Sequence, residues 1–250
     1  WWQNKVWKGI TMKINIFDSK KELYDAVARY FIDKVKSNPE IHLGLATGST
    51  PVPLYERLII DHKVNHTSYK KVKSFNLDEY IGLPRTHEQS YYTFMNNNLF
   101  KHIDITETYI PNGEASDILA EAKSYKELLE REGVDLQILG IGSNGHIGFN
   151  EPNTPFDSHV HIVDLAKSTI KDNARFFEGN LDLVPKKAIT MGIKDIMAAK
   201  EIVLIATGKA KSKAINEVVN GKVDTFVPAT ILQKHPNVHL YLDKDAASKL

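Results

Sequence analysis

Short apolar runs alternate with longer amphipathic segments along nearly the whole chain, and this alternation restricts the possible folds more than any other feature. The runs suit buried strands and lie at 14–17, 41–46, 72–77, 136–142, 201–206 and 238–243. Strands that alternate with helices imply βαβ units, in which helices cover both faces of a parallel sheet. The sequence therefore predicts an α/β fold with an open, mostly parallel sheet and helices on both faces.

Three of the intervening segments carry apolar residues at helical spacing. In the segment 20–37 they recur at i, i+4, i+7 and i+8, as on one face of a helix. Segments 118–132 and 209–221 show the same spacing. No repeat and no linker rich in Pro, Gly or Ser interrupts the series, so we expect residues 12–250 to form a single domain.

Composition excludes several function classes. Lys plus Arg is 32 and Asp plus Glu is 31, so no net charge directs the chain toward nucleic acid or anionic membranes. Cysteine is absent, which excludes disulfides, thiolate zinc sites and a cysteine nucleophile. With no apolar run near the ~18 residues of a membrane span and no secretion signal, we expect a cytoplasmic protein. The sequence leaves open whether it is a monomer or a homo-oligomer.

The three tryptophans of the chain all stand at positions 1, 2 and 7, before a strand-like run begins at Met12. We interpret residues 1–11 as an N-terminal extension, non-native or disordered, that lies outside the functional domain. An aromatic arm docked on the domain is the alternative.

The first candidate for ligand binding is a turn of Thr47, Gly48, Ser49 and Thr50 that follows an apolar run. Ligands of open α/β sheets bind beyond the carboxyl ends of the strands. Thr50 suits the N-cap of a following helix and Pro51 suits its first position. Free N–H groups at such a helix start bind phosphate, although an ordinary capped helix explains the same residues.

Basic residues at two other places can complete a phosphate site. Lys209, Lys211 and Lys213 follow the run 201–206, where a lysine can act as a point charge on phosphate. Arg175 directly precedes two phenylalanines. Solvated surface charges are the alternative for each.

Two adjacent carboxylates end the run 72–77. Neighbouring side chains of a strand point to opposite faces, so Asp78 and Glu79 cannot act as a carboxylate pair. One of them can face the crevice as a general base, and we favour Asp78. A salt bridge at the strand end is the alternative.

The stretch "GIGSNGHIGFNEP", residues 140–152, contains the spacing G-x-G-x-x-G. A dinucleotide site needs a helix directly after the last glycine, but Pro152 and Pro155 follow within ten residues. Neither the serine-hydrolase elbow nor a helical metal-binding motif occurs. We therefore expect neither a dinucleotide nor a metal at this loop.

The same loop places His146 beside Asn144, Gly145 and Glu151. A carboxylate near a histidine can fix its tautomer and raise its pKa toward neutrality, which suits acid–base chemistry. Glycines let the backbone approach a ligand closely. A structural or solvated histidine is the alternative.

The motifs "LATGSTP", "FNLDEYIGLP", "GIGSNGHIGFNEP", "NARFF" and "GKAKS" occur in this order along nearly all of residues 12–245. Together they resemble the glucosamine-6-phosphate deaminase family. The resemblance implies conversion of glucosamine 6-phosphate and water to fructose 6-phosphate and ammonia, without a cofactor.

The resemblance also implies a role for each matching residue. Asp78 is expected to take the C2 proton, and His146, oriented by Asn144 and Glu151, is expected to assist ring opening. The remaining positions are expected to bind substrate, mainly its phosphate: Thr47, Gly48, Ser49, Thr50, Tyr91, Gly145, Arg175 and Lys211.

Two departures from the family pattern stand out. Asn144 replaces an aspartate that some members carry, so the pKa of His146 should be lower than with two carboxylates. Regulated members carry a basic pair where His161 and Val163 stand, and their tails are longer. We therefore expect no activation by N-acetylglucosamine 6-phosphate.

Two other functions compete with deamination. 6-Phosphogluconolactonases share the fold and a related Gly-His loop, although "GFNEP" and "LDEY" favour the deaminase. A non-catalytic sugar-phosphate sensor would have no need of Asp78, His146 and Glu151 together.

Overall fold

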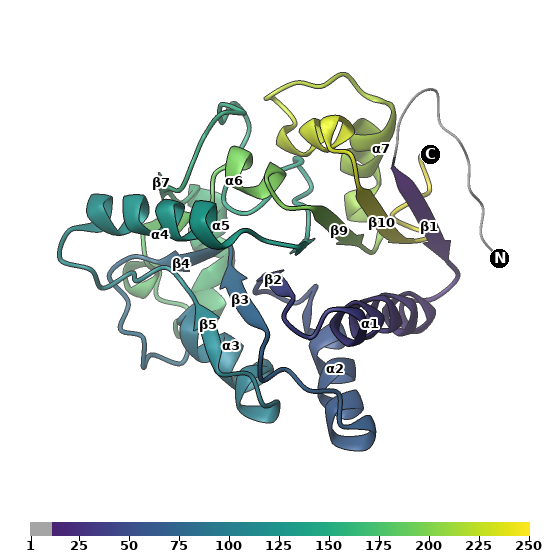
Figure 1. Cartoon of the computed structure of the whole chain (residues 1–250). Coiled ribbons are helices and arrows are strands. Elements are labelled where there is room, and N and C mark those ends of the chain that lie inside the picture. The colour runs from purple at the N-terminus through teal and green to yellow at the C-terminus, as the bar shows by residue number, and fades with distance from the viewer. Residues whose placement is uncertain (1–11) are drawn as a thin grey trace.

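Seven parallel strands form the main sheet of the computed structural model, which describes residues 12–250. The strands lie in the order β1-β10-β9-β6-β2-β3-β5 (Figure 1), and each predicted apolar run forms one of them. The bounds are β1 (Lys13–Phe17), β2 (His42–Leu45), β3 (Lys73–Asn76), β5 (Glu107–Tyr109), β6 (Leu136–Leu139), β9 (Glu201–Ala206) and β10 (Val238–Asp243). The predicted α/β fold with a mostly parallel sheet is confirmed. Residues 1–11, interpreted as an extension, lie outside the described residues.

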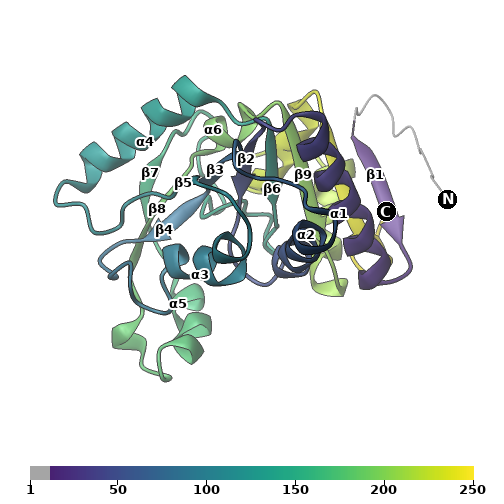
Figure 2. The ribbon, with the colours of Figure 1, turned by 60° about the horizontal axis from the view of Figure 1, so that its bottom comes forward.

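Helices cover both faces of this sheet. Figures 1 and 2 show α1 and α2 on one face and α7 on the other. The bounds are α1 (Lys20–Ser37), α2 (Val52–Asn65), α3 (Tyr91–Asn98), α4 (Ile118–Glu132), α5 (Lys167–Asn173), α6 (Ile193–Met197) and α7 (Ser212–Asn220). Short 3₁₀ turns are η1 (Phe100–His102), η2 (Ala174–Phe176), η3 (Leu181–Leu183), η4 (Lys209–Lys211) and η5 (Pro228–Lys234).

The first and fourth helices follow their predicted bounds because their apolar residues face the core. On α1, Leu23, Val27 and Phe31 are fully buried, and Ser19 caps the helix by accepting from the N–H of Glu22. The predicted segment 209–221 divides into η4 and α7.

The predicted start of α2 is wrong by one residue. The carbonyl of Pro51 accepts the first helical hydrogen bond, from Tyr55 N at 2.9 Å, so Pro51 is the N-cap and Val52 the first helical residue. Thr50 makes no capping bond; its hydroxyl side chain lies instead toward the neighbouring strand end.

A second sheet of three antiparallel strands was not predicted. It contains β4 (Asp78–Tyr80), β8 (Lys187–Thr190) and β7 (His161–Asp164), in that order. The chain passes between the sheets at Leu77, whose N–H donates to Leu45 O (3.1 Å) and whose carbonyl accepts from Met191 N (2.7 Å). Asp78 therefore does not end the predicted strand 72–77; it begins a strand of another sheet.

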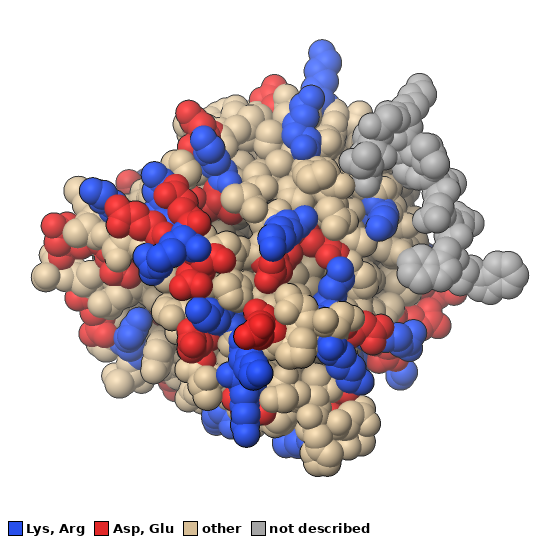
Figure 3. Space-filling model, in the orientation of Figure 1, with Lys and Arg blue, Asp and Glu red and all other residues tan. Residues whose placement is uncertain are grey.

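Charges of both signs are mixed on the face of the molecule shown in Figure 3, where lysines and arginines are interspersed with carboxylates. Among the helices of residues 12–250, none is long and apolar enough to cross a membrane.

Candidate active site

Four neighbouring parallel strands carry the predicted site residues at their carboxyl ends. In sheet order β9, β6, β2 and β3, these strands lead to Lys211, the loop 140–152, the turn 47–50 and Asp78. From β2 the chain continues toward β3 on one side, and from β6 toward β9 on the other. Ligands bind in open α/β sheets at such a reversal of strand order.

The turn 47–50 presents unpaired backbone donors. Gly48 has φ +90°, which a residue with a side chain rarely adopts. Within residues 12–250, the N–H groups of Gly48, Ser49 and Thr50 have no hydrogen-bond acceptor. Tyr24 holds the turn by donating its hydroxyl to Thr50 O at 2.7 Å. The arrangement suits an anion.

One of the two predicted cations, Lys211, reaches the loop 140–152. Lys211 donates from Nζ to Ile141 O at 2.6 Å, and burial lowers its pKa. Arg175 is exposed on η2, with its guanidinium 4.6 Å from the ring centre of Phe176. Among the described contacts, Arg175 has none with Lys211 or the turn 47–50. The structure thus brings Lys211 to the loop 140–152 but leaves Arg175 on the segment between β7 and β8.

Asp78 and Glu79 have different surroundings although both are buried. Glu79 accepts three backbone N–H bonds, from Tyr80, Tyr91 and Tyr92, each at 2.9 Å, so it holds the start of α3. The carboxylate of Asp78 accepts no hydrogen bond from the described residues. Burial, followed by repulsion from Glu79, raises the pKa of Asp78 to about 8. Only Asp78 is available as a base.

The loop 140–152 holds His146 in one orientation. Asn144 accepts at Oδ1 from His146 N (3.1 Å) and lies 2.8 Å from Nδ1, while its Nδ2 donates to Glu151 Oε2 at 2.8 Å. Glu151 Oε1 lies 3.5 Å from Nδ1. Because both neighbours of Nδ1 are acceptors, Nδ1 carries the proton and Nε2 is left free. His146, Asn144 and Glu151 are brought together as predicted.

The predicted rise in the pKa of His146 is wrong. Burial lowers it, and although Glu151 raises it, the charge of Lys211 lowers it further. One carboxylate, itself about one-third exposed, does not offset desolvation. Burial therefore favours the neutral form of His146.

Glycine is required where the ring of His146 lies. A Cβ on Gly142 would come within 2.2 Å of the ring atoms Cε1 and Nδ1. Gly145 has φ +85°, and a Cβ there would lie 2.4 Å from the side chain of Val227. The glycines thus make room for the imidazole rather than for a dinucleotide.

Tyr91 lies beside the site, as predicted, in a group of aromatic rings. It packs 4.7 Å from Tyr80 and stacks on Phe149 at 6.3 Å, measured between ring centres. Burial raises its pKa well above the usual value, while a hydrogen bond with Thr47 lowers it. Asn173 of α5 donates to the hydroxyl of Tyr80 at 2.8 Å, which ties the segment after β7 to the site.

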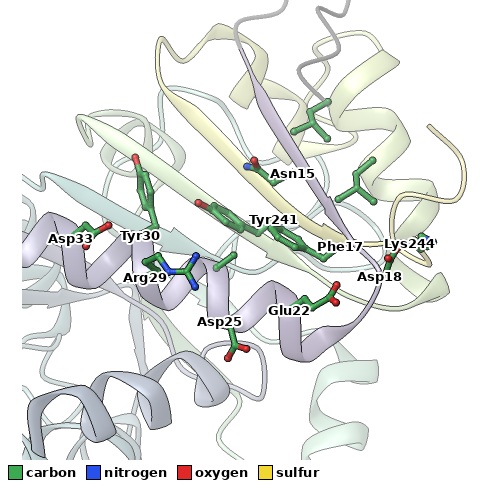
Figure 4. A pocket seen from close by; sticks show the side chains of 13 residues that line it. Asn15, Phe17, Asp18, Glu22, Asp25, Arg29, Tyr30, Asp33, Tyr241 and Lys244 are labelled. Atoms are coloured by element: carbon green, nitrogen blue, oxygen red, sulfur yellow. Dashed lines mark ion pairs between the residues drawn. The ribbon is translucent and has the colours of Figure 1, made fainter. Parts of the chain in front are cut away.

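A cavity of about 960 Å³ lies between β1 and α1, away from these strand ends. Figure 4 shows Phe17, Tyr30 and Tyr241 along it, with Glu22 and Asp25 on α1. None of the predicted site residues lines it, and its carboxylates do not suit an anionic ligand.

Within residues 12–250, no group of three or more His, Cys, Asp or Glu side chains is arranged to hold a metal ion. Three residues next to the site were not predicted: Tyr24, Asn150 and Thr190. The asparagine of "GFNEP" was visible as part of a motif, but Tyr24 and Thr190 reach the site through contacts that no local pattern signals.

Comparison with known proteins identifies the family. A family model described as glucosamine-6-phosphate isomerases/6-phosphogluconolactonase matches residues 18–240. The chain belongs to this family. Among its members, the chain is similar to a glucosamine-6-phosphate deaminase of Clostridium novyi, 52% identical over 96% of this chain and 100% of the relative. It is also similar to one of Halalkalibacterium halodurans, 53% identical over 89% of this chain and 92% of the relative.

Solved structures agree with this membership. A monomeric glucosamine-6-phosphate deaminase, 42% identical, superposes with a TM-score of 0.91 over 95% of this chain and 99% of its own. The 6-phosphogluconolactonase of Trypanosoma brucei, 21% identical with a TM-score of 0.75 over 95% of this chain and 98% of its own, shares the fold. The predicted resemblance to the glucosamine-6-phosphate deaminase family is confirmed.

Proposed function

We propose that the protein converts glucosamine 6-phosphate and water to fructose 6-phosphate and ammonia. The observation that carries this proposal is a pair of groups that follow β3 and β6, the strands on either side of β2 in the main sheet. Asp78 is a buried carboxylate without a hydrogen-bond partner among the described residues, and His146 is a histidine whose Nδ1 is held by Asn144. The deaminase names of relatives that are about half identical support the same reaction.

Binding of the phosphate comes first in the proposed mechanism. The unpaired N–H groups of the turn 47–50 and the ammonium of Lys211 would bind the phosphate dianion, and Arg175 would join them. Because the phosphate is remote from the reacting carbons, this binding orients the sugar. Tyr91 and the backbone of Gly145 would line the sugar site.

Ring opening would use His146. Its free Nε2 takes the proton of the C1 hydroxyl and delivers a proton to the ring oxygen, so that the pyranose opens to the aldehyde. Glu151 and Asn144 hold Nδ1 and stabilise the transient imidazolium. A pKa below the ordinary value keeps His146 ready to accept this proton at pH 7.

Isomerisation and release of ammonia would follow. Ionised Asp78 takes the proton from C2, giving an enolamine, and returns it to C1; water then hydrolyses the resulting imine at C2 and ammonia leaves. A carboxylate with a pKa near 8 is a stronger base than an exposed one. No step requires a cofactor. We place the reaction in amino-sugar catabolism in the cytoplasm.

The test is a substrate comparison with the purified protein. We expect ammonium and fructose 6-phosphate in equal amounts from glucosamine 6-phosphate, and kcat/KM that rises with pH up to about 8 as Asp78 ionises. Consumption of 6-phosphogluconolactone alone would replace the proposal with the lactonase function. Binding of glucosamine 6-phosphate without turnover would indicate the sensor.

A further inference from the structure

Thr190 is a buried polar residue for which the proposed mechanism has no use. It ends β8, is fully buried, and pairs with Asp78 in the antiparallel register of β4 and β8. Directly opposed residues of two antiparallel strands have Cβ atoms ~5 Å apart on one face. Thr190 is therefore the cross-strand neighbour of the proposed base.

The hydroxyl of Thr190 also holds the loop that carries the histidine. Its Oγ1 accepts from the N–H of Phe149 at 3.3 Å and donates to Met191 O at 3.2 Å. Phe149 lies three residues after His146 in the same loop. One side chain thus contacts the loop while its own backbone is paired with the strand of Asp78.

Asn150 makes a second attachment at the same point. It is fully buried, and its Nδ2 donates to Ile147 O and to Met191 O, both at 2.9 Å. The loop is therefore fastened to the end of β8 through two consecutive residues, Phe149 and Asn150.

Gly148 shows how closely the loop passes over the base. Gly148 has φ +57°. A Cβ added to it would lie 3.2 Å from Thr190 Oγ1 and 3.9 Å from Asp78 Oδ2. The loop, Thr190 and the carboxylate of Asp78 therefore meet at one point, so a shift of the loop changes its distance from the base.

We propose that Thr190 is a positioning residue that sets the separation between His146 and Asp78 by hydrogen bonding to the loop. This inference rests on the proposed deamination, in which both groups act on one sugar. Thr190 touches no reacting atom and acts through Phe149. The phosphate-binding turn 47–50 and Lys211 follow other strands, so substrate affinity should depend little on it.

Three substitutions test the proposal by steady-state kinetics with glucosamine 6-phosphate. Thr190→Val keeps the shape but removes the acceptor for Phe149 N–H, and kcat should fall about 10-fold or more with KM changed less than about 3-fold. Thr190→Ser keeps the hydroxyl and should retain kcat within about 3-fold. Thr67→Val is the control, because Thr67 is buried in the segment before β3, at the end of that strand opposite Asp78, and its hydroxyl has no partner among the described residues.

Wild-type kcat in Thr190→Val would overturn the proposal, as would equal losses in the valine and serine variants. If Thr190→Val does not fold, Thr190→Ala takes its place against Thr190→Ser with the same expected difference. Amide exchange of Phe149 gives a readout independent of catalysis, and we expect it to be about 10-fold faster in the valine variant. If the wild type releases no ammonium, the proposed function fails while the exchange result still tests the contact; unchanged exchange would refute it.

Discussion

Asp78 and His146, the two titratable groups of the proposed site, stand in opposite surroundings. Asp78 is 7% exposed and accepts no hydrogen bond from the described residues, whereas His146 has a side chain 35% exposed and is bonded at Nδ1. Burial moves both pKa values in the direction of the neutral form, upward for the acid and downward for the base. The proposed reactivity of Asp78 comes from burial without a hydrogen-bond partner, and that of His146 comes from the orientation of its ring.

The difference in surroundings shows how each of the two side chains is held in place. Asp78 begins a short strand of the second sheet, so its backbone is fixed and its carboxylate needs no side-chain partner to be placed. His146 lies in a glycine-containing loop, and the side chains of Asn144 and Glu151 orient its ring. Activity should therefore be most sensitive to loss of the charge at Asp78, whereas at His146 it should be most sensitive to loss of a side chain that bonds the ring.

The largest expected effect comes from Asp78→Asn. An amide cannot take the C2 proton, so kcat should fall by roughly 10²–10⁴-fold with little change in KM. Ammonium release measured at pH 8 checks this. Turnover at the wild-type rate would show that another group is the base.

The same variant should be more stable than the wild type at alkaline pH. Because folding raises the pKa of Asp78 to about 8, its contribution to stability is fully present below the unfolded pKa of ~3.9 and is lost as pH rises through 8. Urea unfolding at pH 9 should show a gain on the order of a few kcal/mol, with a smaller difference at pH 5. Glu79→Gln is the matched control and should lose stability, because one amide oxygen replaces two that accept three N–H bonds.

A smaller effect is expected from Asn144→Asp, which makes the two surroundings more alike. A second carboxylate beside Nδ1 should raise the pKa of His146, while its repulsion from Glu151 limits the gain. Activity should change less than ~10-fold. NMR titration of the imidazole measures the pKa directly, and an unchanged value would mean that Asn144 does not govern it.

The smallest expected effect is that of N-acetylglucosamine 6-phosphate. On β7, His161 pairs with Thr190 and Val163 with Ala188, and neither supplies the permanent cation of a basic pair. Substrate saturation should shift less than about 2-fold when the compound is added. A clear fall in the half-saturating substrate concentration would contradict this expectation.

Sequence patterns predicted those parts of the molecule that local periodicity determines. The apolar runs became six strands of the main sheet, and residues 20–37 and 118–132 became helices at those bounds. The second sheet escaped prediction because β4 has three residues and pairs only with distant segments. β5, also of three residues, lies at the sheet edge and has no apolar run.

The candidate site shows the same division. Strand ends and loop motifs pointed to Asp78, His146 and Lys211, and these residues follow β3, β6 and β9 at the same edge of the main sheet. Burial of His146 could not be predicted from the sequence, so the predicted direction of its pKa shift was wrong. Thr190 was missed because its importance depends on a register between segments more than 100 residues apart.

The passage of the chain at Leu77 has a consequence for the length of the substrate. The turn proposed to bind phosphate belongs to the main sheet, and Asp78 belongs to the second. A single residue joins them, hydrogen-bonded to Leu45 on one side and Met191 on the other. In the proposed reaction, the two sheets would thus hold the phosphate-binding turn and the base at a fixed separation and select a sugar whose reactive carbon stands a set number of bonds from its phosphate.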